Sequence, residues 1–224
     1  MIEVCFCVYK RWQRVPDILQ NLLNQTNQDF KVNIWNNSGQ NLDVSKFPAG
    51  RIQVIDLGCN LGSAARFKIV PRTMGNPIIF FDDDEILDND FVDYYWKQYQ
   101  KFGPDYILGW FTRIFNQEHY WHSIPYSIYG TEVDYVGTGG MILDRKIFDQ
   151  EQSLADIPEE FSRVEDLYLG YIARMKYGMK LSAIEKKCSI MVDVHDQFRS
   201  LTDYKQKTFL FMRQKGWKIL KDKI

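Results

Sequence analysis

Three consecutive acidic residues, Asp82, Asp83 and Asp84, follow a short apolar run at residues 78–81. The run is rich in residues that favour strands, and its lack of polar positions is typical of a strand buried on both faces. Strand propensity does not explain the carboxylates, because aspartate is depleted in strands and like charges repel. Two explanations fit. Either the carboxylates hold a divalent cation such as Mg²⁺ or Mn²⁺, or they form a solvated loop in which an aspartate caps the next element.

The acidic segment belongs to an alternation of strand-like and helix-like segments in the first half of the chain. The segments expected to be strands are residues 2–8, 30–35, 51–57, 78–81 and 105–111. Apolar stripes at helical spacing begin at Val15 and Phe91. This alternation predicts a parallel, doubly wound sheet in an α/β fold, and ligands of such sheets bind beyond the carboxyl ends of the strands. Tyr9, Asn36 and Asp82 all follow strands, so we expect a binding site at that edge.

The second half of the chain has a more mixed pattern. Residues 132–136 and 141–143 are expected to be strands, and a glycine-rich turn that includes Gly139 and Gly140 separates them. Glycines at this position either let the backbone approach a ligand closely or form a bulge. Residues 113–129 are rich in aromatic side chains and are expected to form a loop. We find no internal repeat or linker, which predicts a single domain.

Composition narrows the class of protein. The chain has 224 residues, enough for one sizeable domain with a full core. Its net charge of -1 argues against a broad nucleic-acid-binding surface. No apolar run approaches transmembrane length, and the N-terminus lacks a signal-peptide pattern, so we expect a soluble, cytoplasmic protein without a transmembrane segment. The four cysteines lack the spacing of a zinc site and are expected to be reduced packing residues.

The motifs occur in an order that resembles GT-A glycosyltransferases, most closely the inverting, family-2-like enzymes. The segments that carry this resemblance are residues 8–11, residues 60–66, Asp82–Asp84, residues 137–140, the pair Glu165 and Asp166, and the late histidine His195. Each motif alone is a weak signal, but six of them in order along nearly the whole chain are specific. The chain is also similar to small glycosyltransferase domains of large algal DNA viruses, for which the compartment would be the host cytoplasm.

The resemblance implies both a fold and an activity. The fold would be a single GT-A (nucleotide-diphospho-sugar transferase) domain with a mostly parallel sheet flanked by helices. Residues 1–111 would be the nucleotide-binding half, and residues 112–224 the acceptor-binding half. The activity would be the inverting transfer of a hexose or pentose from a nucleotide-sugar, with UDP as the favoured carrier, to a hydroxyl of a carbohydrate acceptor. No nucleic-acid partner is implied.

The resemblance also implies roles for individual residues. Asp84, with Asp82 and His195, would hold Mn²⁺ or Mg²⁺, which neutralises the departing diphosphate. Asp166 would be the general base for the acceptor hydroxyl, and Glu165 belongs to the same catalytic motif. The residues expected to contact the nucleotide-sugar are Val8, Tyr9, Arg11, Asn36, Asn60, Arg66, Asp82, Asp83, Gly139 and Gly140. The sequence departs from many relatives at Asn36 and Asn37, where they carry an acid that contacts the base.

Several of these assignments have a structural alternative. The spacing from Ser162 to Glu165 matches a capping box, which fully explains Glu165. An acid such as Asp166 in a first turn also suits the helix dipole. His195 fits a hydrogen-bonded histidine at a strand end, and Arg66 fits a surface salt bridge. Three further residues suit either acceptor contacts or packing: Trp110, Trp121 and His122.

Other classes of protein are weighed by the motifs they require. An oxidoreductase of the dinucleotide-binding type needs G-x-G-x-x-G after the first strand, and a P-loop NTPase needs G-x-x-x-x-G-K-[ST]; neither is present. A phosphatase with an aspartate nucleophile is expected to carry its acids after the first strand, not the fourth. A nucleotidyltransferase, which shares the fold and the metal, is the strongest enzymatic alternative. A non-catalytic module that binds carbohydrate or nucleotide is the non-enzymatic one.

Overall fold

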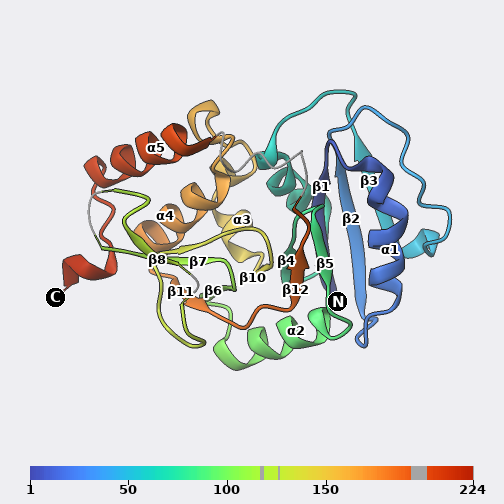
Figure 1. Cartoon of the computed structure of the whole chain (residues 1–224), viewed down its shortest axis with the longest axis horizontal. Coiled ribbons are helices and arrows are strands. Elements are labelled where there is room, and N and C mark those ends of the chain that lie inside the picture. Colours follow the sequence, from blue (N-terminus) through green and yellow to red (C-terminus); the bar gives the residue numbers. More distant parts are fainter. Residues whose placement is uncertain (117–118, 126, 193–200, 224) are drawn as a thin grey trace.

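The computed structural model describes residues 1–116, 119–125, 127–192 and 201–223, and a seven-stranded sheet forms its centre (Figure 1). The strands lie side by side in the order β11, β6, β10, β4, β1, β2, β3. Their bounds are Ile2–Val8 for β1, Phe30–Asn36 for β2, Ile52–Asp56 for β3, Ile78–Phe80 for β4, Tyr106–Gly109 for β6, Met141–Leu143 for β10 and Lys180–Ala183 for β11. Of these described strands, only β10 runs antiparallel to its neighbours. The expected mostly parallel α/β sheet is therefore confirmed.

Apolar residues cover both faces of the sheet. Successive side chains of a strand point to opposite faces, so Phe6 of β1 packs in the cluster that contains Leu19, whereas its neighbour Cys5 packs in the cluster that contains Phe67. Both Cys5 and Phe6 are fully buried. A strand covered on both sides has no polar face, which explains the continuous apolar runs that predicted β1 and β4.

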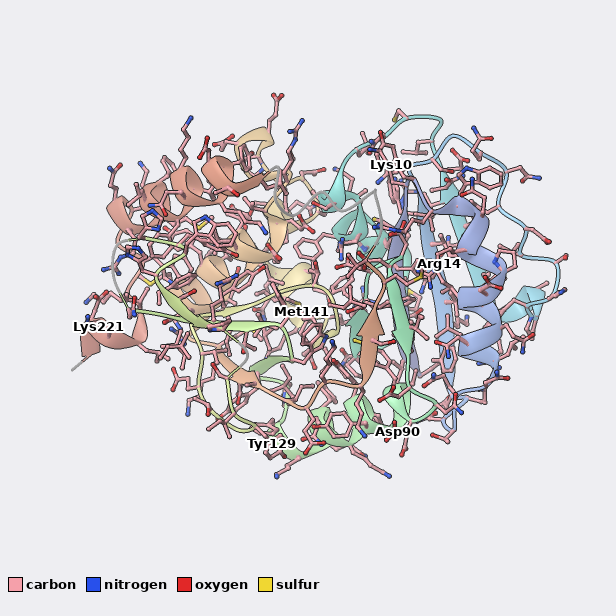
Figure 2. The ribbon with its side chains drawn as sticks, viewed as in Figure 1. Lys10, Arg14, Asp90, Tyr129, Met141 and Lys221 are labelled. Atoms are coloured by element: carbon pink, nitrogen blue, oxygen red, sulfur yellow. The ribbon has the colours of Figure 1, made fainter. Side chains whose placement is uncertain are left out.

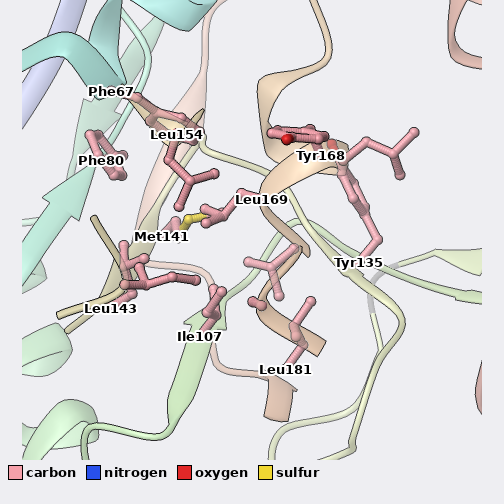
Figure 3. Close-up of a cluster of buried hydrophobic side chains, with 14 of the residues drawn as sticks. Phe67, Phe80, Ile107, Tyr135, Met141, Leu143, Leu154, Tyr168, Leu169 and Leu181 are labelled. Atoms are coloured by element: carbon pink, nitrogen blue, oxygen red, sulfur yellow. The ribbon is translucent and has the colours of Figure 1, made fainter. Parts of the chain in front are cut away.

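Helices supply the cover on each face. On one face lie α1 (Val15–Leu23) and α2 (Phe91–Phe102). On the other lie the 3-10 segment η3 (Ser63–Arg72) and the helices α3 (Lys146–Gln150), α4 (Glu165–Tyr177) and α5 (Thr202–Gln214). Figure 3 shows the second core, in which Phe67, Phe80, Met141 and Leu169 lie together. The remaining described 3-10 segments are η1 (Trp12–Arg14), η2 (Ala49–Arg51), η4 (Gln152–Leu154), η5 (Glu159–Phe161) and η7 (Leu220–Lys223).

Two small antiparallel sheets complete the described fold. In the first, β7 (Thr112–Phe115) pairs with β8 (Ser123–Pro125) and β9 (Tyr135–Val136). The expectation that residues 113–129 form a loop is therefore wrong in part, because the aromatic content obscured the short strands β7 and β8. In the second, β5 (Glu85–Leu87) pairs with β12 (Cys188–Ile190).

Candidate active site

A cleft of about 1040 Å³ opens at the carboxyl ends of β1 and β4, the sheet edge that the sequence predicts for a ligand. Residues from both halves of the chain line it. They are Cys7, Tyr9, Lys10, Arg11, Asn37, Asn60, Leu61, Gly62, Ser63, Arg66, Asp82, Asp83, Asp84, Glu159, Ser162, Arg163 and Leu201. Figure 2 shows Lys10 beside the end of β1 that borders this cleft.

The three aspartates of the cleft have different surroundings. Asp83 is the most buried, with 12% of its side chain exposed, against 39% for Asp82 and 27% for Asp84. Its carboxylate accepts hydrogen bonds from the backbone N–H of Tyr9 at 3.2 Å and from Nη1 of Arg11 at 3.1 Å. Asp83 therefore fastens the loop after β1 to the loop after β4, whereas Asp82 and Asp84 keep more of their surface toward the cleft.

Negative charge is concentrated around Asp84. Burial, reinforced by the charge of Asp82, raises the pKa of Asp84 to about 7, although Arg11 lies 3.6 Å away and opposes the rise. The next residue, Glu85, is buried beneath the cleft, and its Oε2 accepts a hydrogen bond from the backbone N–H of Asp82 at 3.0 Å. Burial and the charge of Asp82 raise the pKa of Glu85 to about 8. This arrangement of like charges would be relieved by a cation.

The absence of a side chain at Gly139 leaves room for the carboxylates of Asp82 and Glu85. A Cβ atom at this position would lie 3.0 Å from Oδ2 of Asp82 and 3.1 Å from Oε1 of Glu85. Any larger residue would therefore push the carboxylates away from their present positions. The expected close approach at the glycine turn thus takes place against the acidic side chains, and Gly139 is not among the residues that line the cleft.

Arg66 joins Asp82, which follows β4, to Glu165, the first residue of α4. Its Nη1 contacts Oδ1 of Asp82 at 2.6 Å, and its Nε lies 3.2 Å from Oε1 of Glu165. The hydroxyl of Ser63 donates to Oε2 of Glu165 at 2.5 Å. Both Arg66 and Glu165 are buried, and burial raises the pKa of Glu165 to about 7 although the Arg66 guanidinium opposes this. Through these contacts Arg66 links η3, the segment after β4 and the first turn of α4.

The capping box predicted for Ser162 and Glu165 is wrong. Val164 is the N-cap of α4, and no side chain caps that end of the helix. The Glu165 carboxylate is instead engaged by Arg66 and Ser63, and the Ser162 hydroxyl donates to the backbone oxygen of Glu159 at 2.8 Å. The local pattern was misleading because a partner distant in sequence competes for the glutamate.

Asp166 is the next residue of α4, but its carboxylate has other neighbours. The hydroxyl of Tyr135 on β9 donates a hydrogen bond to Oδ2 of Asp166. The ammonium group of Lys205 on α5 is buried, which lowers its pKa, while the negative charges of Asp166, Glu165 and Asp82 oppose this. Asp166 is half-buried and is not among the residues that line the cleft.

Several other predicted residues lie away from the cleft lining. Val8 is buried in the core. Asn36 is buried as well, and its amide donates to Oδ2 of Asp56 at 2.7 Å, so it ties the end of β2 to the end of β3. Gly140 has a φ of +70°, and a Cβ there would approach the hydroxyl of Tyr95 to 2.6 Å. His195 lies outside the described residues.

The remaining predicted donor contacts, Tyr9, Arg11, Asn60, Arg66, Asp82 and Asp83, do line the cleft. Motif reasoning missed Glu159, Arg163 and Leu201, which reach the cleft from segments next to α4 and α5. They carry no local pattern that would single them out. Trp110, a candidate for acceptor contacts, is buried, with 6% of its surface exposed. Within the described residues, no group of three or more histidine, cysteine or acidic side chains is arranged to hold a metal ion.

The fold and cleft are those of an α/β protein of the GT-A type, and comparison with known proteins identifies the family. A model described as "Glycosyl transferase family 2" matches residues 3–151. The chain belongs to glycosyl transferase family 2. No curated protein sequence matches it significantly. Among the described residues, every helix is too short or too polar to cross a bilayer.

Solved structures of S. aureus TarS have a similar fold. The TarS crystal structure aligns with a TM-score of 0.61 at 16% identity, over 85% of this chain and 36% of TarS. The fragment TarS 1-349 aligns with a TM-score of 0.58 at 17% identity, over 84% of this chain and 59% of the fragment. The same fragment in complex with UDP aligns with a TM-score of 0.61 at 15% identity, over 98% of this chain and 67% of the fragment. The chain thus spans about a third to two thirds of these proteins, and likeness at such identity concerns the fold.

Proposed function

We propose that this chain transfers a sugar from a nucleotide-sugar, with UDP as the carrier, to a hydroxyl group of a carbohydrate acceptor. The observation that carries the proposal is the cleft at the carboxyl edge of β1 and β4, lined by Asp82 and Asp84 in a chain of glycosyl transferase family 2. The UDP complex of the similar TarS fragment supports UDP as the carrier. Lys10 and Arg163, which also line the cleft, supply positive charge for a diphosphate.

The donor atoms in the cleft fit a hard divalent cation. Asp82 and Asp84 offer carboxylate oxygens, the ligand type that Mg²⁺ and Mn²⁺ prefer. Their crowded negative charge, expressed in the raised pKa of Asp84, favours a cation between them. We therefore propose Asp84 and Asp82 as ligands, with His195 as a further ligand. A bound cation would offset the charge that develops on the departing diphosphate.

The acceptor hydroxyl needs a base, and we assign that role to Asp166 rather than Glu165. Adjacent residues of a helix point about 100° apart, so the two carboxylates face different surroundings. The Glu165 carboxylate forms an ion pair with Arg66 and accepts a hydrogen bond from Ser63. Asp166 accepts from Tyr135, which orients its carboxylate without supplying a counter-ion. A single base on the acceptor side implies a single displacement with inversion at the anomeric carbon.

A panel of nucleotide-sugars with Mn²⁺ tests this function. In the absence of acceptor, we expect slow release of UDP from a UDP-sugar, and with acceptor a product of inverted configuration. Release of pyrophosphate from a nucleoside triphosphate would instead identify the nucleotidyltransferase alternative. Tight binding of a nucleotide-sugar without any turnover would identify the non-catalytic binding module, and retention of configuration would contradict the single displacement.

A further inference from the structure

The C-terminal segment carries a charge opposite to that of the rest of the chain. Residues 201–224 contain seven of the 28 lysine and arginine residues but only two of the 29 acidic residues, which gives +5 for the segment and -6 for the remainder. In Figure 1, α5 and the C-terminal end lie at the outer end of the molecule, away from α1, and Figure 2 shows Lys221 at that extremity. Positive charge is therefore gathered at one end of the protein.

The outer face of α5 combines this charge with exposed apolar side chains. The helix buries its inner face through Thr208, Phe209 and Met212. On the outer face Leu210 and Phe211 remain 37% and 41% exposed. Phe211 packs in part against Phe161, with ring centres 5.7 Å apart, and the exposed remainder of both side chains faces outward.

Lysines frame the apolar pair. Lys207 and Lys215 stand four residues before and after Phe211, so all three lie on one side of the helix. Both lysines are exposed, and the ammonium group of Lys215 lies 5.4 Å from the centre of the Phe211 ring. Beyond the helix, Lys218 is exposed and borders a hollow of about 350 Å³ that Leu210 also lines. The outer face of α5 thus has an apolar centre and a mainly cationic rim, with the exposed Asp203 as an acidic member in its first turn.

We propose that the outer face of α5 docks onto an anionic lipid surface. An interfacial helix buries apolar side chains at the boundary between headgroups and acyl chains, while lysines bind the phosphates around them. Leu210 and Phe211 match the first requirement, and Lys207, Lys215 and Lys218 match the second. A nucleic acid would use the cations but would leave the aliphatic Leu210 without a partner, so the lipid surface accounts for more of the face.

Docking in this orientation would bring the cleft close to the lipid surface. Leu201, directly before the first residue of α5, lines the cleft. The helix therefore starts at the cleft and presents its outer face along the same end of the molecule. The proposal does not depend on the chemistry proposed for the cleft, because it concerns residues that take no part in it.

Sedimentation with lipid vesicles tests the proposal on the whole chain. We expect the protein to bind vesicles of mixed phosphatidylcholine and phosphatidylglycerol, to bind phosphatidylcholine alone much more weakly, and to be released by salt. The double variant Lys207→Ala and Lys215→Ala should weaken partitioning about 25-fold, at about fivefold for each lysine. Leu210→Ser should weaken it about tenfold without touching the Phe211 packing against Phe161.

Matched variants on other surfaces serve as controls. Lys46→Ala removes an exposed lysine, and Met74→Ser removes an apolar side chain that is 93% exposed. Neither should change vesicle binding, and all variants should melt at the temperature of the unchanged protein. Absence of binding to anionic vesicles, or equal loss in the control variants, would overturn the proposal. Retention on immobilised RNA without vesicle binding would overturn it in favour of a nucleic-acid partner.

Discussion

Glu165 and Asp166 are neighbours at the start of α4, yet they lie in regions of opposite character. Around Glu165 the contacts are ionic: Arg66 bridges it to Asp82. Around Asp166 the hydrogen bond comes from a neutral hydroxyl, that of Tyr135, and the Lys205 ammonium group acts on it as a nearby charge. Both oxygens of the Glu165 carboxylate are already engaged, one by Arg66 and the other by Ser63, so neither is left for an acceptor hydroxyl. The first acid of the pair is therefore suited to holding structure, and the second to accepting a proton.

The largest expected effect comes from Asp166→Asn, which removes the proton acceptor but keeps the shape of the side chain and its contact with Tyr135. We expect kcat to fall by about 10² to 10⁴ with little change in donor affinity. Steady-state kinetics with the UDP-sugar substrate measure both. The conservative variant Glu165→Gln is the matched comparison, and we expect it to keep most activity. If Glu165→Gln is inactive while Asp166→Asn is active, our assignment of the two acids is reversed.

The next largest effect concerns the stability of the fold, for which we expect the buried Arg66 to matter more than an exposed arginine. Arg66→Met leaves Glu165 buried without its cation, which costs about 3 kcal/mol or more of unfolding free energy. Urea denaturation measures this loss. The exposed Arg72 is the control, and Arg72→Met should change the unfolding free energy by no more than about 0.5 kcal/mol. Equal losses in the two variants would mean that the Arg66 bridge does not stabilise the fold.

A smaller effect is expected from Tyr135→Phe. Hydrogen bonds to charged groups contribute about 1.5 kcal/mol or more, so losing this one should lower kcat roughly tenfold, as measured by steady-state kinetics with the UDP-sugar. The groups that face Asp166 in this region are Tyr135, Tyr120, Lys205 and Glu165.

Tyr99→Phe is the matched control for that variant. The Tyr99 hydroxyl on α2 also donates a hydrogen bond to a carboxylate, that of Asp144, and neither residue lines the cleft. Tyr99→Phe should leave kcat unchanged. If Tyr135→Phe and Tyr99→Phe have the same kcat, then Tyr135 does not orient the base.

The donor side of the cleft could be predicted from the sequence because its parts are local. The aspartates follow β4 after one intervening residue, and Tyr9 directly follows β1, so strand prediction alone brings them to one edge. The surroundings of the two α4 acids could not be predicted in this way. Ser63 reaches Glu165 from 102 residues earlier in the chain, and Tyr135 reaches Asp166 from a strand of only two residues. Short strands and distant partners leave no periodic pattern.

The most direct test measures donor binding and turnover in the same pair of variants. A thermal-shift assay with UDP and Mn²⁺, run beside the turnover assay, compares Asp84→Ala with Asp166→Asn. Because ligand binding stabilises the folded state by mass action, we predict that Asp84→Ala loses both the UDP-dependent shift and turnover, whereas Asp166→Asn keeps the shift and loses turnover. An unchanged UDP and Mn²⁺ shift in Asp84→Ala, with turnover that persists in a chelator, would contradict the assignment of Asp84 to donor binding and of Asp166 to catalysis.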